Sequence, residues 1–386
     1  MKYDFDTLTL RRGTNSYKWD EAEDDDVIPL WVADMDFQTA PCIVEALKER
    51  VAHGIFGYTM VPDSYYKATT DWFARRHGWQ IERRHMMYTS GVVPALSATI
   101  KALTSPGDKV LVQTPVYNCF FSSIRNNGCT IEESQLKRTD DSYVVDFDDF
   151  EQKCSDPDVK VFVMCNPHNP AGRVWTADEI RQMRDICYRH DVTVVADEIH
   201  CELVMPGYRY TPCATVCPEQ NDRLVVLNSP SKSFNIAGLQ IANIITENDS
   251  LLKKIDRAVN INEVCDVNPF GVIALQAAYN EGEEWLCQLN DYLYHNYLLL
   301  KAFFETHLPQ IKILRLEGTY LVWADITALH IGSDNLTQRL LDEAKVWLNS
   351  GTMYGKTAGE GYLRINIACP RQRLEEALCH IGKVLC

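Results

Sequence analysis

The sequence has no long apolar run and no excess of basic charge. None of its 386 residues belongs to an uncharged apolar stretch near the ~20 residues that cross a bilayer. The opening Met1–Leu8 lacks the apolar core of a secretory signal. The formal net charge is −15, whereas binding to polyanions requires a basic surface. We therefore expect a cytoplasmic protein with neither membrane nor nucleic acid as a partner.

Common metal and nucleotide motifs are also missing. Cys213 and Cys217 form one Cys-x₃-Cys pair without a second pair at zinc-finger spacing, so we expect no metal site. The 14 cysteines are spread through predicted strands and helices, as is typical of buried free thiols. No Gly-x-Gly-x-x-Gly follows a predicted strand. Ser350–Thr357 resembles a P-loop only with its first glycine displaced, and we interpret it as a Gly-rich loop near the substrate.

The length favours two domains, because 386 residues exceed one simple core. Strand and helix patterns alternate through most of the chain, which predicts an α/β fold with a mostly parallel sheet and helices on both faces. Thr176-Ala-Asp-Glu179 has the pattern of a capping box at a helix start. The expected parts are an N-terminal arm (1–40), a large domain (41–280) and a small domain (281–386).

One lysine stands in a Ser-rich turn after an apolar run. Arg223–Asn228 predicts a strand, and Ser229-Pro-Ser231-Lys232 follows it. Lys232 is placed there to form an imine with an aldehyde while hydroxyls and amides hold a phosphate beside it. Pyridoxal phosphate (PLP) makes this demand on a protein. An ordinary solvated turn is the alternative for this stretch alone.

A carboxylate ends the preceding strand pattern. Val192–Asp197 is a β-branched apolar run of the kind found in buried parallel strands, and Glu198-Ile-His200 follows it. Ligands of open α/β sheets bind at such strand ends. An aspartate beside the pyridine nitrogen of PLP keeps that nitrogen protonated. The alternative for Asp197 is a helix cap.

Two further strand patterns end in polar or aromatic residues. Val159–Cys165 leads to Asn-Pro-His-Asn169-Pro, whose Asn169 amide is placed to bond the phenolic oxygen of the cofactor. Val110–Thr114 leads to Tyr117, whose ring is placed to stack on the pyridine. A tight turn at Asn169 and a core tyrosine at position 117 are the alternatives.

A helix start completes the pattern. Ser90-Gly91-Val92-Val93-Pro94 predicts a helix beginning after Gly91, because proline is tolerated in the first turn. The N–H groups of Gly91, Val92 and Val93, with the helix dipole, favour an anion. We interpret this as the main phosphate site, with an ordinary helix start as the alternative.

In this order, and with Tyr362-Leu-Arg364-Ile-Asn366 near the end, the motifs resemble the aspartate-aminotransferase superfamily of PLP enzymes (fold type I, class I/II). Pro29–Phe37 and Phe56-Gly-Tyr58 are similar to the MalY/PatB group, which are cystathionine β-lyases also described as C–S lyases. The resemblance extends from about Ile28 to the C-terminus. It implies a large domain with a mostly parallel, seven-stranded sheet flanked by helices, and a smaller α+β domain.

The resemblance also implies residue roles. Lys232 is the imine lysine and proton shuttle, and Arg364 grips the substrate α-carboxylate as a guanidinium fork. Tyr58 reaches the phosphate of the neighbouring subunit, so a homodimer with shared sites is expected. The implied catalytic residues are Lys232, Tyr117 and Asp197; the cofactor-binding residues are Gly91, Val92, Val93, Tyr117, Asn169, Asp197, His200, Ser229, Ser231, Lys232 and Tyr58; the substrate-binding residues are Arg364, Tyr58 and Asn169.

Two positions differ from many aminotransferases. Gln240 replaces an arginine eight residues after the lysine, and His200 replaces a tyrosine three residues after the aspartate. Both are in keeping with the lyase group. The implied activity is α,β-elimination of cystathionine or cysteine conjugates to a thiol, pyruvate and ammonia. An amino acid aminotransferase and a regulatory binding protein that retains a PLP site are the alternatives.

Overall fold

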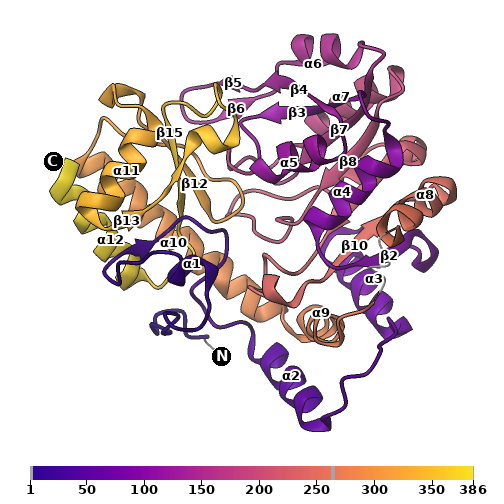
Figure 1. The fold of residues 1–386 in the computed structure, drawn as a ribbon, viewed down its shortest axis with the longest axis horizontal. Coiled ribbons are helices and arrows are strands. Elements are labelled where there is room, and N and C mark those ends of the chain that lie inside the picture. Colours follow the sequence, from indigo (N-terminus) through magenta and orange to yellow (C-terminus); the bar gives the residue numbers. More distant parts are fainter. Residues whose placement is uncertain (1–2, 262–265, 386) are drawn as a thin grey trace.

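A seven-stranded sheet forms the centre of the larger part of the molecule (Figure 1). The structure is a computed structural model that describes residues 3–261 and 266–385. The strand order is β2-β10-β9-β8-β7-β3-β4; strands run parallel from β4 to β9, and β10 is antiparallel to both its neighbours. The strands are β2 (Met86–Thr89), β3 (Lys109–Thr114), β4 (Thr130–Gln135), β7 (Val159–Cys165), β8 (Thr193–Asp197), β9 (Leu224–Asn228) and β10 (Ala242–Ile245). The mostly parallel seven-stranded sheet expected from the sequence is confirmed.

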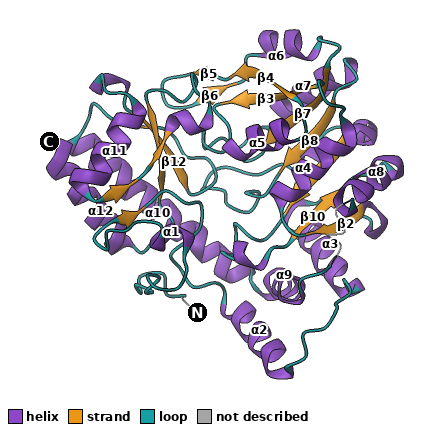
Figure 2. Ribbon diagram, viewed as in Figure 1, coloured by secondary structure: helices purple, strands orange, loops and turns teal. Residues whose placement is uncertain are grey.

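Helices cover both faces of this sheet (Figure 2), and the apolar runs of its central strands supply both faces with side chains. Successive residues of a strand point to opposite faces. Along β7, Val161 and Val163 accordingly belong to one core cluster, and Phe162 and Met164 belong to the other. The helices of this part are α2 (Pro41–His53), α3 (Asp63–His77), α4 (Val92–Leu103), α5 (Asn118–Asn126), α6 (Phe147–Cys154), α7 (Ala177–Arg189), α8 (Asp249–Asn260) and α9 (Pro269–Glu281).

The predicted capping box opens α7. The Thr176 hydroxyl accepts a hydrogen bond from the Glu179 N–H, and the Glu179 carboxylate accepts one from the Thr176 N–H. Two N–H groups of the first turn are thereby satisfied.

The C-terminal part is built on a second, antiparallel sheet with the strand order β11-β12-β15-β14. The N-terminal arm lies beside this part (Figure 1), because its β1 pairs in parallel with β13. The elements are β11 (Lys312–Ile313), β12 (Leu321–Asp325), β13 (Val346–Trp347), β14 (Asn349–Ser350), β15 (Tyr362–Asn366), α10 (Glu283–His307), α11 (Ser333–Ala344) and α12 (Arg371–Leu385), with α1 (Tyr17–Asp20) and β1 (Ile28–Pro29) in the arm, and the hairpin β5 (Lys137–Arg138) and β6 (Tyr143–Val144) in the larger part.

The described residues lack the features of two other classes of site, and their cysteines form no disulfide. No helix in 3–261 or 266–385 is long and apolar enough to cross a membrane. The same residues contain no group of three or more His, Cys, Asp or Glu side chains arranged to hold a metal ion. The cysteines within these ranges are free thiols.

Candidate active site

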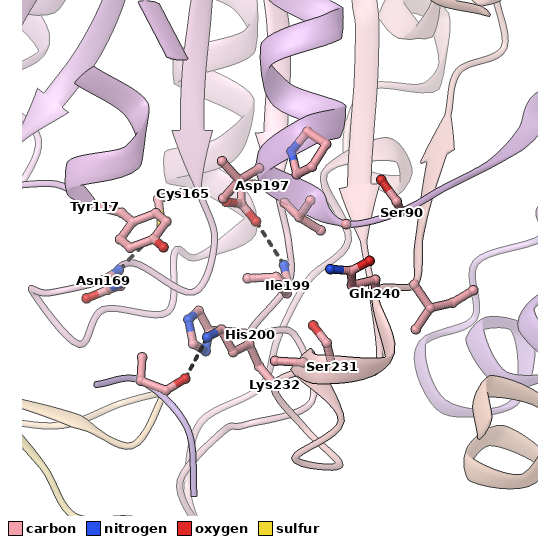
Figure 3. Close-up of a pocket in the computed structure, with 17 residues that line it drawn as sticks. Ser90, Tyr117, Cys165, Asn169, Asp197, Ile199, His200, Ser231, Lys232 and Gln240 are labelled. Atoms are coloured by element: carbon pink, nitrogen blue, oxygen red, sulfur yellow. Dashed lines mark hydrogen bonds between the residues drawn. The ribbon is translucent and has the colours of Figure 1, made fainter. Parts of the chain in front are cut away.

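The carboxyl ends of β3, β7, β8 and β9 meet at one cavity of about 290 Å³ (Figure 3). Parallel strands bring their carboxyl ends to the same edge of a sheet, which is where open α/β sheets bind ligands. Of the residues that the sequence motifs single out, ten line this cavity: Gly91, Val92, Val93, Tyr117, Asn169, Asp197, His200, Ser231, Lys232 and Gln240.

Lys232 projects into the cavity from the turn after β9. Its Nζ donates a hydrogen bond to the Ala33 carbonyl at 2.6 Å (Figure 3). Burial lowers the pKa of Lys232 to about 8, while the Asp34 carboxylate opposes this decrease and the Arg364 guanidinium adds to it. An amine with this pKa is substantially neutral near pH 8, and so it can act as a nucleophile or a base.

Asp197 ends β8 and is 4% exposed. Among the described residues its carboxyl has a single hydrogen-bond partner, the Ile199 N–H at 3.1 Å, and no ion-pair partner. Burial raises the pKa of Asp197 to about 7, and the Ile199 N–H and the Lys232 charge act against this increase. A buried carboxyl without a cation fits a ligand that brings a positive charge to it, as a pyridinium does.

The start of α4 faces the same cavity. Gly91 is its N-cap, with φ of 156°, and no side chain caps the helix. The first N–H groups of a helix lack intrahelical partners and attract an anion. Ser90, Gly91, Val92 and Val93 all line the cavity, and Ser231 and Gln240 face them from the turn after β9 (Figure 3). This arrangement fits the phosphate of the predicted cofactor.

Asn169 and Tyr117 lie at the ends of the neighbouring strands (Figure 3). The Asn169 N–H donates to Cys165 Sγ at 3.4 Å, and its Oδ1 accepts from Arg364 Nη1 at 3.3 Å. Burial raises the pKa of Tyr117 well above its usual value, and the nearby Cys119 thiol adds to the increase. Tyr117 is therefore a neutral phenol that can donate a hydrogen bond.

Arg364 reaches the site from β15 of the second sheet. Its Nη2 donates to the Trp31 carbonyl at 2.8 Å, and its guanidinium lies 4.7 Å from the centre of the Tyr354 ring. Arg364 is 3% exposed, and its Nε has no partner among the described residues. A buried guanidinium without a carboxylate leaves an N–H donor available to an acidic ligand.

His200 lies beside Lys232 at the cavity wall (Figure 3). Burial and the charges of Lys232 and Arg364 lower the pKa of His200, so its imidazole is neutral. Its Nδ1 has no partner among the described residues. The ring packs edge-on against Tyr320, whose hydroxyl donates to the Ala33 carbonyl at 2.9 Å.

Three residues of the predicted set do not line the cavity: Arg364, which lies beside it and bonds to Asn169, and Ser229 and Tyr58. The Ser229 hydroxyl donates to the Ile241 carbonyl and accepts from the Ser231 N–H, so within this chain it supports the turn that carries Lys232. Tyr58 is 96% exposed between α2 and α3 and has no role in the site of its own chain.

The sequence motifs did not indicate the role of Ala33. Its carbonyl accepts from both Lys232 and Tyr320. Pro29–Phe37 resembles a family motif, but every residue carries a peptide carbonyl and no residue type marks one that will accept a hydrogen bond. Ser90 and Cys165 also line the cavity without having been singled out.

The fold and the site together define an α/β protein of the aminotransferase type, with an amine, a buried carboxyl, an anion-binding helix start and an arginine around one cavity. The family model for aminotransferases of class I and II matches residues 25–381. Cystathionine beta-lyase PatB of Bacillus subtilis is 41% identical over 385 residues, covering 99% of each chain.

Two solved structures match equally completely. Cystalysin from Treponema denticola, whose crystal structure contains a pyridoxal 5′-phosphate cofactor, has a TM-score of 0.97 and 34% identity over 100% of this chain and 99% of its own. The PLP-bound C–S lyase from Staphylococcus hominis has a TM-score of 0.93 and 35% identity over 99% of both chains. The chain belongs to the class I and II aminotransferase family, in its MalY/PatB-type group. The resemblance predicted from the motifs is thus confirmed.

Proposed function

We propose that this chain is a PLP-dependent C–S β-lyase that eliminates a thiol from cystathionine or related cysteine conjugates and yields pyruvate and ammonia. The observation that carries the proposal is the shared cavity of Lys232, Asp197 and the α4 N-terminus, with Arg364 of the second sheet beside it. The 41% identity to a protein named cystathionine beta-lyase supports the choice of reaction.

The residues of the cavity fit the cofactor by their chemistry. Lys232 would hold the aldehyde carbon, and Asp197 would face the pyridine nitrogen. Gly91, Val92, Val93 and Ser231 would bind the phosphate, Asn169 and Tyr117 would bind and cover the ring, and His200 and Ser229 would support its surroundings. When bound, PLP supplies an electron sink that stabilises negative charge at the substrate α-carbon.

The residues of the chain itself then perform three tasks. Arg364 holds the substrate α-carboxylate, because its fork matches two carboxylate oxygens. Lys232, once free, exchanges the proton at the substrate α-carbon, for which a pKa of about 8 is suited. The carbonyl groups of Trp31 and Ala33 orient these two side chains by accepting hydrogen bonds from Arg364 and Lys232. When the C–S bond breaks, the sulfur takes up the proton that Lys232 holds and leaves as a thiol, and water converts the released aminoacrylate to pyruvate and ammonia.

We also propose a cytoplasmic homodimer in which Tyr58 completes the partner's phosphate site. The segment between α2 and α3 exposes a row of large apolar side chains, which isolated soluble proteins seldom do. The exposed fractions are 66% for Ile55, 54% for Phe56, 96% for Tyr58 and 86% for Met60. Within each subunit, the two sheets support a division into an arm (1–40), a large domain (41–280) and a small domain (281–386).

Product analysis tests the activity. The full-length protein loaded with PLP should release pyruvate and free thiol from cystathionine without any keto acid. Strict dependence on 2-oxoglutarate would instead identify an aminotransferase, whose chemistry the same residues serve. Sedimentation analysis of the wild type and of Tyr58→Ala tests the proposed dimer independently of the activity. A wild-type protein that sediments as a monomer would contradict the shared site.

A further inference from the structure

Residues 31–37, which we call the strap, line the cavity through Ala33 and form hydrogen bonds to both parts of the molecule. The Ala33 carbonyl accepts from Lys232 Nζ at 2.6 Å. The Asp34 carbonyl accepts from Asn366 Nδ2 of β15 at 2.7 Å. The Met35 N–H donates to Asn235 Oδ1, three residues beyond Lys232, at 3.0 Å. The strap is therefore fixed at the point where it meets the reactive amine.

Four charged side chains of the N-terminal arm and the strap form a cluster next to this point. Arg11 forms two bonds to the Asp34 carboxylate, at 2.7 and 3.1 Å, and one to Asp36 at 2.7 Å. Lys18 is fully buried and lies 2.9 Å from Asp36 and 3.6 Å from Asp34. Two cations and two carboxylates balance, as burial of charges requires.

The two carboxylates have different surroundings. Asp36 is 5% exposed and also accepts from Trp19 Nε1 at 2.8 Å, so its charge is enclosed by its partners. Asp34 is 23% exposed, and it directly follows the residue whose carbonyl holds Lys232. Of the two strap carboxylates, Asp34 is the one whose charge acts on the Lys232 amine.

The other charged or titratable groups around Lys232 come from three elements and the turn after β8. Asp197 ends β8, His200 follows it, Arg364 lies on β15 and Cys119 lies in the first turn of α5. Burial is the largest cause of the lowered pKa of Lys232, and Asp34 is the strongest influence in the opposite direction. Arg364 acts with burial, whereas Asp197 and Cys119 act with Asp34.

We propose that Asp34 is a positioning residue for Lys232: held by Arg11 and Lys18, its carboxylate favours the protonated amine and keeps it against the Ala33 carbonyl. This inference rests on the proposed role of Lys232 as the proton carrier of the reaction. A lysine that has taken a proton from substrate must hold it in one place until it is passed on. Through Asp34, the N-terminal arm would thereby influence the proton carried by Lys232, a residue of the larger part of the molecule.

The test is the titration of the Lys232 amine in the full-length protein freed of cofactor with hydroxylamine. Brief reductive methylation at a series of pH values, read by peptide mass spectrometry, gives the midpoint at which Lys232 becomes reactive. In Asp34→Asn the midpoint should fall by about half a pH unit to one unit, because a partly exposed charge is removed. Asp25→Asn is the matched control: this arm carboxylate is 90% exposed, 3.6 Å from Arg12, and should leave the midpoint unchanged.

Two further variants separate the carboxylate charge from loosening of the arm. Asp34→Glu keeps the charge and should restore the midpoint. The double variant Arg11→Gln, Asp34→Asn removes a cation together with the carboxylate, so the cluster remains balanced. Its midpoint should stay as low as in Asp34→Asn. A wild-type midpoint in Asp34→Asn, or recovery in the double variant, would overturn the proposal. Neither cofactor nor turnover enters this titration, so its failure is distinguishable from failure of the proposed lyase activity.

Discussion

Replacement of Arg364 by glutamine should impair the proposed reaction more selectively than it impairs the fold. The change removes the positive charge and the fork but leaves an amide of similar length. The lost interaction is a charge pair between a buried guanidinium, 3% exposed, and the substrate carboxylate. Removing one partner of such a pair costs about 2–4 kcal/mol. That free energy corresponds to a decrease of about 30- to 900-fold in kcat/KM.

The bonds that Arg364 already makes predict a second effect, on the stability of the fold. Arg364→Gln also removes its hydrogen bonds to the Trp31 carbonyl and to Asn169 Oδ1. Hydrogen bonds to charged groups contribute about 1.5–3 kcal/mol each, and the bond to Asn169 is long at 3.3 Å. We therefore expect a decrease in the melting temperature as well. Arg364→Lys keeps the positive charge without the fork, and its kcat/KM should lie between that of the wild type and that of Arg364→Gln.

The assay is steady-state release of pyruvate from cystathionine, with kcat and KM measured separately. PLP content is checked by visible absorbance so that loss of cofactor is not mistaken for loss of substrate binding. Arg339→Gln is the control, because this α11 arginine is 42% exposed and pairs with Glu343 on the surface. If Arg364→Gln binds PLP normally and keeps kcat/KM within about threefold of the wild type, the assignment of the carboxylate site is refuted.

Three other substitutions test separate features. Lys232→Ala should abolish turnover and the covalent attachment of PLP, as measured by mass spectrometry after borohydride reduction; retained attachment would move the reactive amine elsewhere. Asp197→Asn should flatten the pH dependence of stability: the pKa of Asp197 is raised to about 7 in the cofactor-free fold, so wild-type stability should fall as pH rises from about 4 to 7, and equal slopes in thermal melts of both proteins would contradict this. Gly359→Ala would place a Cβ 1.8 Å from the Gly351 carbonyl and should lower unfolding free energy by about 1–3 kcal/mol in urea titrations, whereas Gly238→Ala, with no atom within 4 Å, should have little effect.

The central strands were predictable because each has a strong local signal. The predicted runs are Val159–Cys165, Val192–Asp197 and Arg223–Asn228. Strand β7 occupies the first, and β8 and β9 begin one residue inside the other two. Parallel strands buried on both faces require such continuous runs. The same signal located Asn169 and Asp197, since strand ends in this fold meet at one edge.

The antiparallel strand β10 was harder to predict from the sequence. β10 has four residues, and one of them is Asn243, a residue type more typical of turns. Asn243 is fully buried because Tyr65 donates to its Oδ1 at 2.7 Å and its Nδ2 donates to Asn228 at 3.3 Å. These partners lie 178 and 15 residues away in the chain. A long-range polar contact of this kind leaves no periodic pattern in the local sequence.

The partner to which a side chain donates a hydrogen bond could not be predicted from the sequence either. A serine at position 229 indicates a hydroxyl near the reactive turn, but the hydroxyl donates to Ile241 of its own chain. The contacts of the strap with Lys232 and Arg364 end on peptide carbonyls, which carry no residue-specific signal.

The reliance of the strap on peptide groups has an evolutionary consequence. Because the acceptors at Trp31, Val32 and Ala33 belong to the main chain, the side chains there can drift without losing these bonds. Selection should act against proline at position 35, since proline would remove the N–H that donates to Asn235 Oδ1. Mutational robustness in this stretch should therefore depend on the path of the backbone, while the donors that reach it from elsewhere stay under purifying selection.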